Sequence, residues 1–117
     1  MDINKTGLWG EIYAARFLRE NGFDLIAGNY RRRVGEIDII AEKNGTIFFV
    51  EVKTRGENPM FRPMEAVDSY KRERLKAAAA LYLKDIAQER ISQFDVIEVM
   101  LGKNYELINI NRIENAF

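Results

Sequence analysis

The chain has 117 residues, 47% of them hydrophobic, which is enough for one core and close to the common size of one domain. Its 18 lysines and arginines balance 18 aspartates and glutamates, so no bulk positive field attracts polyanions, which argues against a packaging or coating protein. The lack of cysteine and histidine excludes disulfides, thiolate zinc sites and histidine-based triads. We therefore expect one domain over residues 1–117, with chemistry carried by carboxylates, amines, guanidiniums and hydroxyls.

The first half of the chain predicts one helix and three strands. Lys5 to Asn21 has apolar residues at helical spacing and ends before Gly22, which suits a left-handed C-cap. Phe23 to Tyr30 is the first predicted strand. Strands at Glu36 to Glu42 and Thr46 to Thr54 form a hairpin, and the second is apolar enough to be buried on both faces. The apolar arc of the helix is predicted to contain Leu8, Ile12, Ala14, Ala15, Phe17 and Leu18.

The second half predicts a helix and two more strands. Arg55 to Pro63 contains both prolines of the chain and is expected to be a loop that could act as a flap. A helix is predicted from Ser69 to Glu89, followed by strands from Phe94 to Leu101 and from Tyr105 to Ile110. The order α-β-β-β-α-β-β joins the third and fourth strands through a helical crossover, which predicts an α/β fold with a mixed sheet flanked by helices.

Glu11 occupies an unexpected position in the first predicted helix. It lies near the middle of the apolar arc, so its carboxylate should point towards the sheet rather than into solvent. Burial of an unpaired carboxylate is costly, so a cation or a hydrogen-bond donor is expected beside it. A structural salt bridge to a buried arginine explains the position as well as a functional role does.

Asp38 is predicted to share one face of its strand with Glu36, while Ile37 and Ile39 take the other face. An exposed acidic face on an antiparallel hairpin explains this pattern as well as a metal site does.

Glu51 and Lys53 give a stronger signal. They lie two residues apart on the most apolar strand, so both project from the same face, while Val50 and Val52 fill the opposite face. An acid and a lysine side by side at the end of a central strand are unusual for a plain core.

Glu11, Asp38 and Glu51 can converge on one site, two from adjacent strands and one from the helix above them. Three carboxylates in contact would repel one another and take up protons, and a bound Mg²⁺ or Mn²⁺ would allow them to coexist. Such an ion can polarise a phosphoryl oxygen and lower the pKa of a bound water. Lys53 would orient that water or neutralise charge in the transition state.

The segments that carry these acids also match a known sequence pattern. The run from Gly35 to Ile40, GEIDII, followed by Phe49 to Arg55, FVEVKTR, resembles the PD-(D/E)xK nuclease motif. Over nearly its whole length the chain is similar to the small bacterial YraN-like family, which resembles archaeal Holliday-junction resolvases in fold. Other matching segments are Gly10-Glu11 with Ala14, Asn29-Tyr30-Arg31, Lys71 with Arg74 and Leu75, Phe94-Asp95-Val96, and Asn115-Ala116-Phe117.

This resemblance implies a restriction-endonuclease-like fold, with metal ligands at Asp38 and Glu51 and the motif lysine at Lys53. Glu11 corresponds to the helix glutamate of the resolvase-like branch. Gln93 stands where the resemblance leads us to expect an arginine, so a basic contact at that position is in question.

Several basic residues are candidates for contact with phosphates, which would position a nucleic acid without reading its sequence. A predicted basic turn precedes the strand of Asp38, and a second basic cluster opens the second helix; solvated surface clusters explain both equally simply. Trp9 and Tyr13 fall outside the apolar arc and are expected at a subunit or sheet contact rather than against bases. The candidate nucleic-acid contacts are Arg31, Arg32, Arg33, Arg55, Lys71 and Arg74.

The leading hypothesis is a Mg²⁺- or Mn²⁺-dependent endonuclease, a phosphodiesterase that acts on DNA rather than RNA, including branched or structured DNA. The alternatives are a nucleic-acid binding module with a nuclease fold but no significant turnover, and a structural protein whose carboxylates pair with arginines. A homodimer would help so small a domain to hold a duplex. No signal-peptide pattern opens the chain and no apolar run approaches the ~20 residues that span a bilayer, so we expect no membrane partner and a cytoplasmic location.

Overall fold

Within residues 3–56 and 69–117, which a computed structural model describes, the chain forms two helices and five strands. The predicted order α-β-β-β-α-β-β is therefore confirmed. No helix in this part of the chain is long and apolar enough to cross a membrane. The elements are α1 (Ile3–Glu20), β1 (Asp24–Arg32), β2 (Gly35–Lys43), β3 (Thr46–Gly56), α2 (Ser69–Asp85), β4 (Ser92–Leu101) and β5 (Leu107–Ile113).

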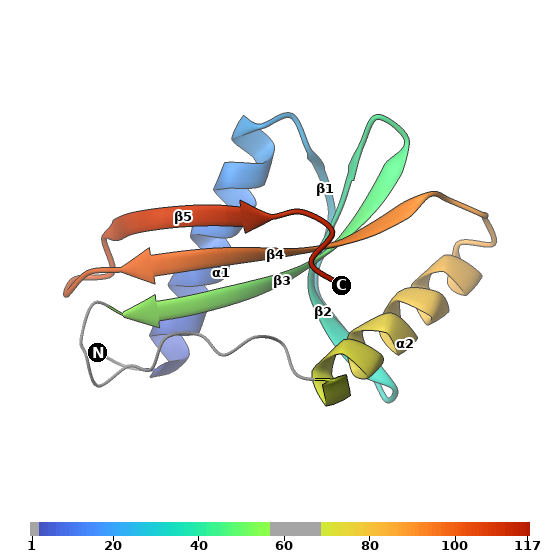
Figure 1. The fold of residues 1–117 in the computed structure, drawn as a ribbon, viewed down its shortest axis with the longest axis horizontal. Helices are drawn as coiled ribbons and strands as arrows, with labels where there is room; N and C mark the ends of the chain where they lie inside the picture. The colour runs from blue at the N-terminus through green and yellow to red at the C-terminus, as the bar shows by residue number, and fades with distance from the viewer. Residues whose placement is uncertain (1–2, 57–68) are drawn as a thin grey trace.

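The five strands form one sheet in the order β1-β2-β3-β4-β5. Neighbouring strands are antiparallel except β3 and β4, which pair in parallel because the chain returns through α2. Figure 1 shows α1 lying across one face of this sheet and α2 lying against the other, beside β2. The predicted mixed α/β architecture is confirmed, and it is consistent with a restriction-endonuclease-like fold.

Each helix closes its own apolar core, and β3 contributes to both. Phe48 and Val50 belong to the core beneath α1, while Ile47 and Phe49 belong to the core beneath α2. Successive side chains of a strand point to opposite faces, so a continuous apolar run is what a strand between two helices requires. The prediction that this strand is buried on both faces is confirmed.

The buried face of α1 differs from the predicted arc. Leu8 and Ile12 were expected to be covered, but they are 56% and 44% exposed. Small residues let the helix axis approach the sheet closely. In the part of the chain that the structure describes, β1 is the edge strand, so no further strand there covers the flank that carries Leu8 and Ile12. The fully buried row at helical spacing consists of Thr6, Gly10, Ala14 and Leu18.

The three consecutive arginines, Arg31 to Arg33, do not form a turn as predicted. Arg31 and Arg32 belong to β1, because the ladder with β2 continues to the pairs Arg31 with Glu36 and Arg32 with Gly35. Only Arg33 lies in the turn. The predicted strand therefore ends two residues too early.

The second helix is shorter than predicted. It ends at Asp85 instead of Glu89, because Ala87 adopts a left-handed φ of 52° that an α-helix cannot continue through. The predicted loop began at Arg55, but β3 continues to Gly56. The remainder of that predicted loop and flap lies outside the described residues.

Trp9 and Tyr13 contact the connection between β4 and β5. The Trp9 ring stacks on the Tyr105 ring with centroids 6.2 Å apart, and the Tyr13 hydroxyl donates a hydrogen bond to the Tyr105 carbonyl oxygen at 2.7 Å. Of the two contacts expected for these rings, the structure shows one within the chain, with the β4–β5 connection, and it helps to fix α1 across the sheet. The subunit contact stays a prediction.

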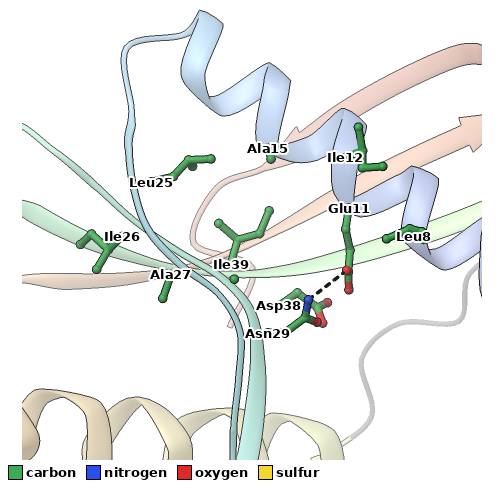
Figure 2. Close-up of a pocket in the computed structure, with 11 residues that line it drawn as sticks. Leu8, Glu11, Ile12, Ala15, Leu25, Ile26, Ala27, Asn29, Asp38 and Ile39 are labelled. Atoms are coloured by element: carbon green, nitrogen blue, oxygen red, sulfur yellow. Dashed lines mark hydrogen bonds between the residues drawn. The ribbon is translucent and has the colours of Figure 1, made fainter.

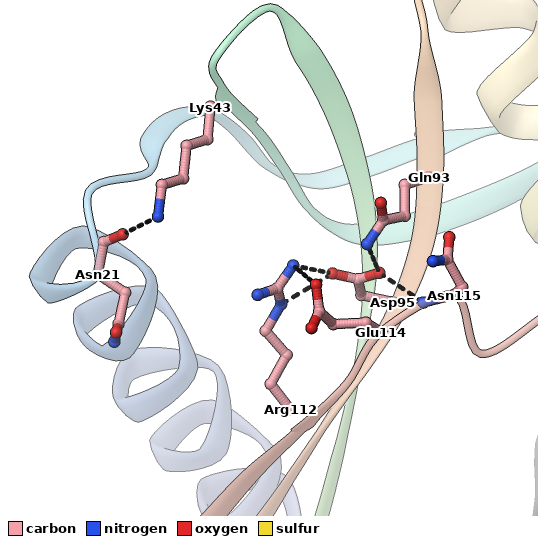
Figure 3. A network of polar contacts seen from close by, with 7 residues as sticks. All are labelled: Asn21, Lys43, Gln93, Asp95, Arg112, Glu114 and Asn115. Carbon is pink, nitrogen blue, oxygen red and sulfur yellow. Dashed lines mark hydrogen bonds and ion pairs between the residues drawn. The ribbon is translucent and has the colours of Figure 1, made fainter.

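Asp95 on β4 is completely buried and anchors the C-terminal segment (Figure 3). It accepts hydrogen bonds from Gln93 Nε2 at 2.8 Å, from Arg112 Nε at 2.9 Å and from the backbone N–H of Asn115 at 3.1 Å. Gln93 therefore has a structural partner in place of the basic contact that the resemblance implied at its position.

Gly10 sets the distance between α1 and β3. A Cβ atom added at Gly10 would lie 1.8 Å from Thr54 Oγ1, whereas one added at Gly7, a turn earlier, would meet nothing within 4 Å. We expect Gly10→Ala to destabilise the protein by about 1–3 kcal/mol by forcing helix and strand apart. Gly7→Ala should be neutral or stabilising by up to about 1 kcal/mol. Urea unfolding measures both, and equal effects of the two substitutions would contradict this account of the helix position.

Candidate active site

The ladder between β2 and β3 ends one residue before Asp38. The paired residues run from Lys43 with Thr46 to Ile39 with Val50. Beyond the last pair, the backbone N–H of Val52 on β3 donates a hydrogen bond to Asp38 Oδ2 at 2.8 Å. A carboxylate thus replaces a main-chain acceptor of the neighbouring strand. Since the ladder with β4 continues along the whole of β3, it is β2 that leaves, and the Asp38 side chain is held where the two strands part.

β1 and β2 both depart from the regular strand conformation at this position. Ile37 belongs to the core under α2 but Ile39 to the core under α1, so the prediction that they share a face is wrong. In β1 the residue opposite Asp38 is Asn29, which has a left-handed φ of 52°. Asparagine tolerates this conformation better than most residues, and it lets both strands bend together around Asp38.

Asn29 was assigned no role from the sequence, although it lies at the site. Its Nδ2 donates a long hydrogen bond of 3.4 Å to Glu11 Oε2 (Figure 2). The dipeptide Gly28-Asn29 inside a predicted strand was the available signal, because both residue types favour left-handed or bulged backbone.

Glu51 and Lys53 lie on the strand face predicted for them. They continue the face of Ile47 and Phe49, and Glu51 lines a hollow of about 230 Å³ together with α2 residues that include Lys71 and Arg74. Lys53 is only 8% exposed. A buried lysine beside a half-buried glutamate is unusual in an apolar strand, because charged side chains are rarely buried for packing alone.

The carboxyl groups of Asp38 and Glu51 are hydrogen-bonded to each other. Burial, followed by the negative charge of Asp38, raises the pKa of Glu51 to about 7, against the opposing charge of Lys53. Burial also raises the pKa of Asp38, opposed by the Val52 N–H and by the hydrogen bond with Glu51. Two adjacent acids favour a state in which one of them carries a proton, and a bound cation can take the place of that proton.

Glu11 lies on the other side of Asp38 from Glu51. It lines the hollow between α1 and β1 with Asp38, and burial, followed by the charge of Asp38, raises its pKa. The sequence predicted that Glu11 points towards the sheet, but its side chain is only half-buried, at the flank of the helix.

The oxygen donors of Asp38 and Glu51 fit a hard divalent cation, because two adjacent carboxylates repel each other when both are ionised and the charge of Lys53 offsets this only in part. Within residues 3–56 and 69–117, no group of three acidic side chains is arranged to hold one ion. Glu11 would have to approach from its position beside Asp38, or act through water, to become a third ligand. The three-carboxylate metal site thus remains a prediction. The structure places Asp38 beside Glu51, and Glu11 beside Asp38.

The predicted phosphate contacts are distributed over four places. Lys71 and Arg74 border Glu51 from α2. Arg31 forms an exposed ion pair of 3.6 Å with Glu36, beside the acids. Arg55 lies in a different hollow with Glu98 of β4, so it is not brought to the acids. Arg32 packs over the Tyr30 ring, with its guanidinium carbon 4.2 Å from the centroid.

Arginine ion pairs do not account for the candidate acids. Asp95, with the Arg112 Nη2 atom at 2.8 Å, is the buried acid that matches the structural hypothesis. None of the arginine partners is a candidate metal ligand. In the described part of the chain, the arginine ion pairs are formed with Glu20, Glu36, Glu42, Asp95 and Glu114.

The fold and site define a small α/β protein with a restriction-endonuclease-like arrangement of strands and paired acids at the point where two of those strands separate. A family model described as "Uncharacterised protein family UPF0102" matches residues 10–99, which include Glu11, Asp38, Glu51 and Lys53. The chain belongs to the UPF0102 family.

Relatives match over essentially the whole chain. A UPF0102 protein of Caldicellulosiruptor saccharolyticus is 38% identical over 118 residues, covering 100% of both chains. UPF0102 proteins of Syntrophomonas wolfei and Alkaliphilus oremlandii are 44% and 43% identical, covering 97% of each chain.

The raised pKa of Glu51 predicts a pH-dependent stability. Because its pKa rises from 4.5 to about 7 on folding, this group stabilises the fold below about pH 4.5 and loses that contribution as the pH rises through 7. We expect Glu51→Gln to melt close to wild type at pH 5 but above it at pH 8 in the presence of EDTA. Adding Mn²⁺ at pH 8 should raise the melting temperature of wild type more than that of the variant.

Glu20→Gln is the matched control, because this side chain is 69% exposed. Its difference from wild type should be the same at both pH values. A Glu51→Gln effect that does not change between pH 5 and pH 8 would contradict the buried, proton-sharing environment of Glu51.

Proposed function

We propose that this UPF0102 protein is a Mg²⁺- or Mn²⁺-dependent endonuclease that hydrolyses phosphodiester bonds in DNA. The observation that carries the proposal is the Asp38–Glu51 pair, held at the opening between β2 and β3 with Lys53 beside it. A protein that only bound nucleic acid would have no need of half-buried acids that repel phosphate, and a purely structural pair would be matched by an arginine as Asp95 is.

The residues of the chain divide the chemical work. Asp38, fixed by the Val52 N–H, and Glu51 would hold the cation, and Glu11 would hold or orient a water next to it. The bound ion would supply Lewis-acid polarisation of a phosphoryl oxygen and a more acidic water. Lys53, already near both carboxylates, would stabilise the negative charge that develops on the phosphate. The buried surroundings strengthen each of these interactions.

The cations that border the acids are suited to the phosphate backbone of the substrate. Lys71 and Arg74 on α2 lie beside Glu51, and Arg31 lies at the end of β1 on the side of Glu11. Such contacts hold a strand without reading its sequence, so we propose weak sequence specificity. DNA is proposed over RNA from the resemblance to resolvases, and branched or distorted DNA is included as substrate.

Cleavage of a panel of linear, flapped and branched DNAs with Mn²⁺ tests the proposal. We expect Glu51→Gln and Lys53→Ala each to lower the cleavage rate at least about 100-fold without loss of the folded circular-dichroism spectrum. Glu20→Gln and Lys103→Ala, which change exposed residues of the same types, should cut like wild type. If Glu51→Gln or Lys53→Ala cut as fast as wild type, the site assignment is wrong. Metal binding without cleavage of any substrate would favour the binding module.

Salt dependence tests the role of the α2 cations. We expect Lys71→Ala and Arg74→Ala each to weaken binding about equally for unrelated DNA sequences and to reduce the slope of log K against log [KCl] by about 1. Fluorescence anisotropy in Ca²⁺ measures this binding. Arg16→Ala is the control, because Arg16 lies on exposed α1 surface and pairs with Glu20. A slope unchanged in Lys71→Ala and Arg74→Ala would exclude both residues from phosphate contact.

A further inference from the structure

An open hollow of about 430 Å³ lies between α1 and β1, directly beside the acids (Figure 2). Its wall is aliphatic, with Leu8 and Ile12 from the helix and Leu25 and Ile26 from the strand. Three of these side chains are large and exposed, at 56% for Leu8, 44% for Ile12 and 43% for Ile26. Its size is within the range of about 300–1,000 Å³ that is usual for small-molecule sites.

The position of Ile26 results from an irregularity in β1. The ladder with β2 passes from Leu25 to Ala27 with a register shift, so Ile26 is the additional residue of a bulge. A bulge gives up ladder contacts and turns its side chain away from the regular pleat, and such features recur next to active sites. Here the bulge places an aliphatic side chain on the rim of the hollow, opposite Ile12.

The other end of the hollow is polar. Glu11 and Asp38 line it together with Asn29, whose side-chain amide makes a long hydrogen bond of 3.4 Å to Glu11. One continuous surface therefore leads from the candidate metal ligands to an apolar wall, with an amide donor and acceptor at the junction (Figure 2).

We propose that this hollow takes up an unpaired nucleobase from the nucleotide next to the cleaved phosphate, an inference that rests on the proposed nuclease function. A phosphate at the acids brings its own nucleoside to the neighbouring surface, and aliphatic side chains suit the face of a base and not a phosphate. Asn29 can bond the edge of that base through its amide. A paired and stacked base cannot enter, so substrates with an unpaired nucleotide at the cleavage position are preferred.

A second copy of the chain fits this surface less well. A protein contact here would cover Glu11 and Asp38 and desolvate carboxylates that have no guanidinium partner in the described structure, which is costly. The free edge of β1 is also a poor template for strand pairing, because of the bulge at Ile26 and the left-handed Asn29. Arg31, on the same strand, complements a phosphate backbone.

The test uses a duplex with one unpaired 2-aminopurine, bound in Ca²⁺, and the same duplex with an abasic site at that position. For wild type we expect a change in 2-aminopurine fluorescence on binding and about tenfold weaker binding of the abasic duplex. Leu8→Ser and Ile12→Ser should lose the fluorescence change and the distinction between base and abasic site. Ile108→Ser is the matched control, since Ile108 is 47% exposed on β5 and should behave as wild type.

The possible outcomes separate the two proposals. Binding by wild type with no fluorescence change and with equal affinity for both duplexes overturns the base-binding hollow. Loss of self-association in sedimentation by Leu8→Ser, with an equal loss of binding to every duplex, also overturns it in favour of a subunit contact. The expected fluorescence and abasic effects without cleavage in Mn²⁺ refute the nuclease function alone. Failure of wild type to bind either duplex overturns the base-binding hollow, and it refutes the nuclease function as well only if no DNA of the panel is cleaved in Mn²⁺.

Discussion

The structure of the candidate site depends on one hydrogen bond, from the Val52 backbone N–H to the carboxylate of Asp38. In a regular sheet this N–H would be bonded to the neighbouring strand, and leaving it unpaired in the interior would be costly. A side chain that accepts it allows β2 to leave β3 without that cost. The same bond fixes the carboxylate where Glu51 can reach it, so the opening of the sheet and the pairing of the acids have one cause.

Asp95, which is buried, and Asp38, which is half-buried, have different surroundings. Asp95 is surrounded by an amide, a guanidinium and a backbone N–H, which satisfy its charge within the chain (Figure 3). Asp38 has the Val52 backbone N–H, the Glu51 carboxyl group and the charge of Lys53 beside it, and burial nevertheless raises its pKa. The first arrangement stabilises the connection between β4 and the C-terminal segment. The arrangement at Asp38 leaves two adjacent acids that a cation would stabilise in their ionised forms, as in a metal site or a site that acts on phosphates.

The sequence predicts the parts of the fold that follow from local periodicity. Strand alternation correctly places Glu51 and Lys53 on one face, because β3 is regular there. It places Ile37 and Ile39 wrongly, because the bend at Asp38 depends on Asn29 in the neighbouring strand. Helical periodicity likewise cannot reveal that the sheet ends at β1, which is why Leu8 is exposed although it belongs to the apolar arc. The face and the exposure of a residue cannot be predicted from the pattern of its own segment when they depend on a neighbouring element.

The parallel pairing of β3 with β4 has a consequence for the order of folding. Asp38, Glu51 and Asn29 all belong to β1, β2 and β3, which are joined by tight hairpins and need only short-range contacts to form. The β3–β4 ladder requires closure of the long crossover that contains α2, so it should form later. The three-stranded meander can therefore assemble with its carboxylates still hydrated, and their desolvation is deferred until the helices and β4 pack around them.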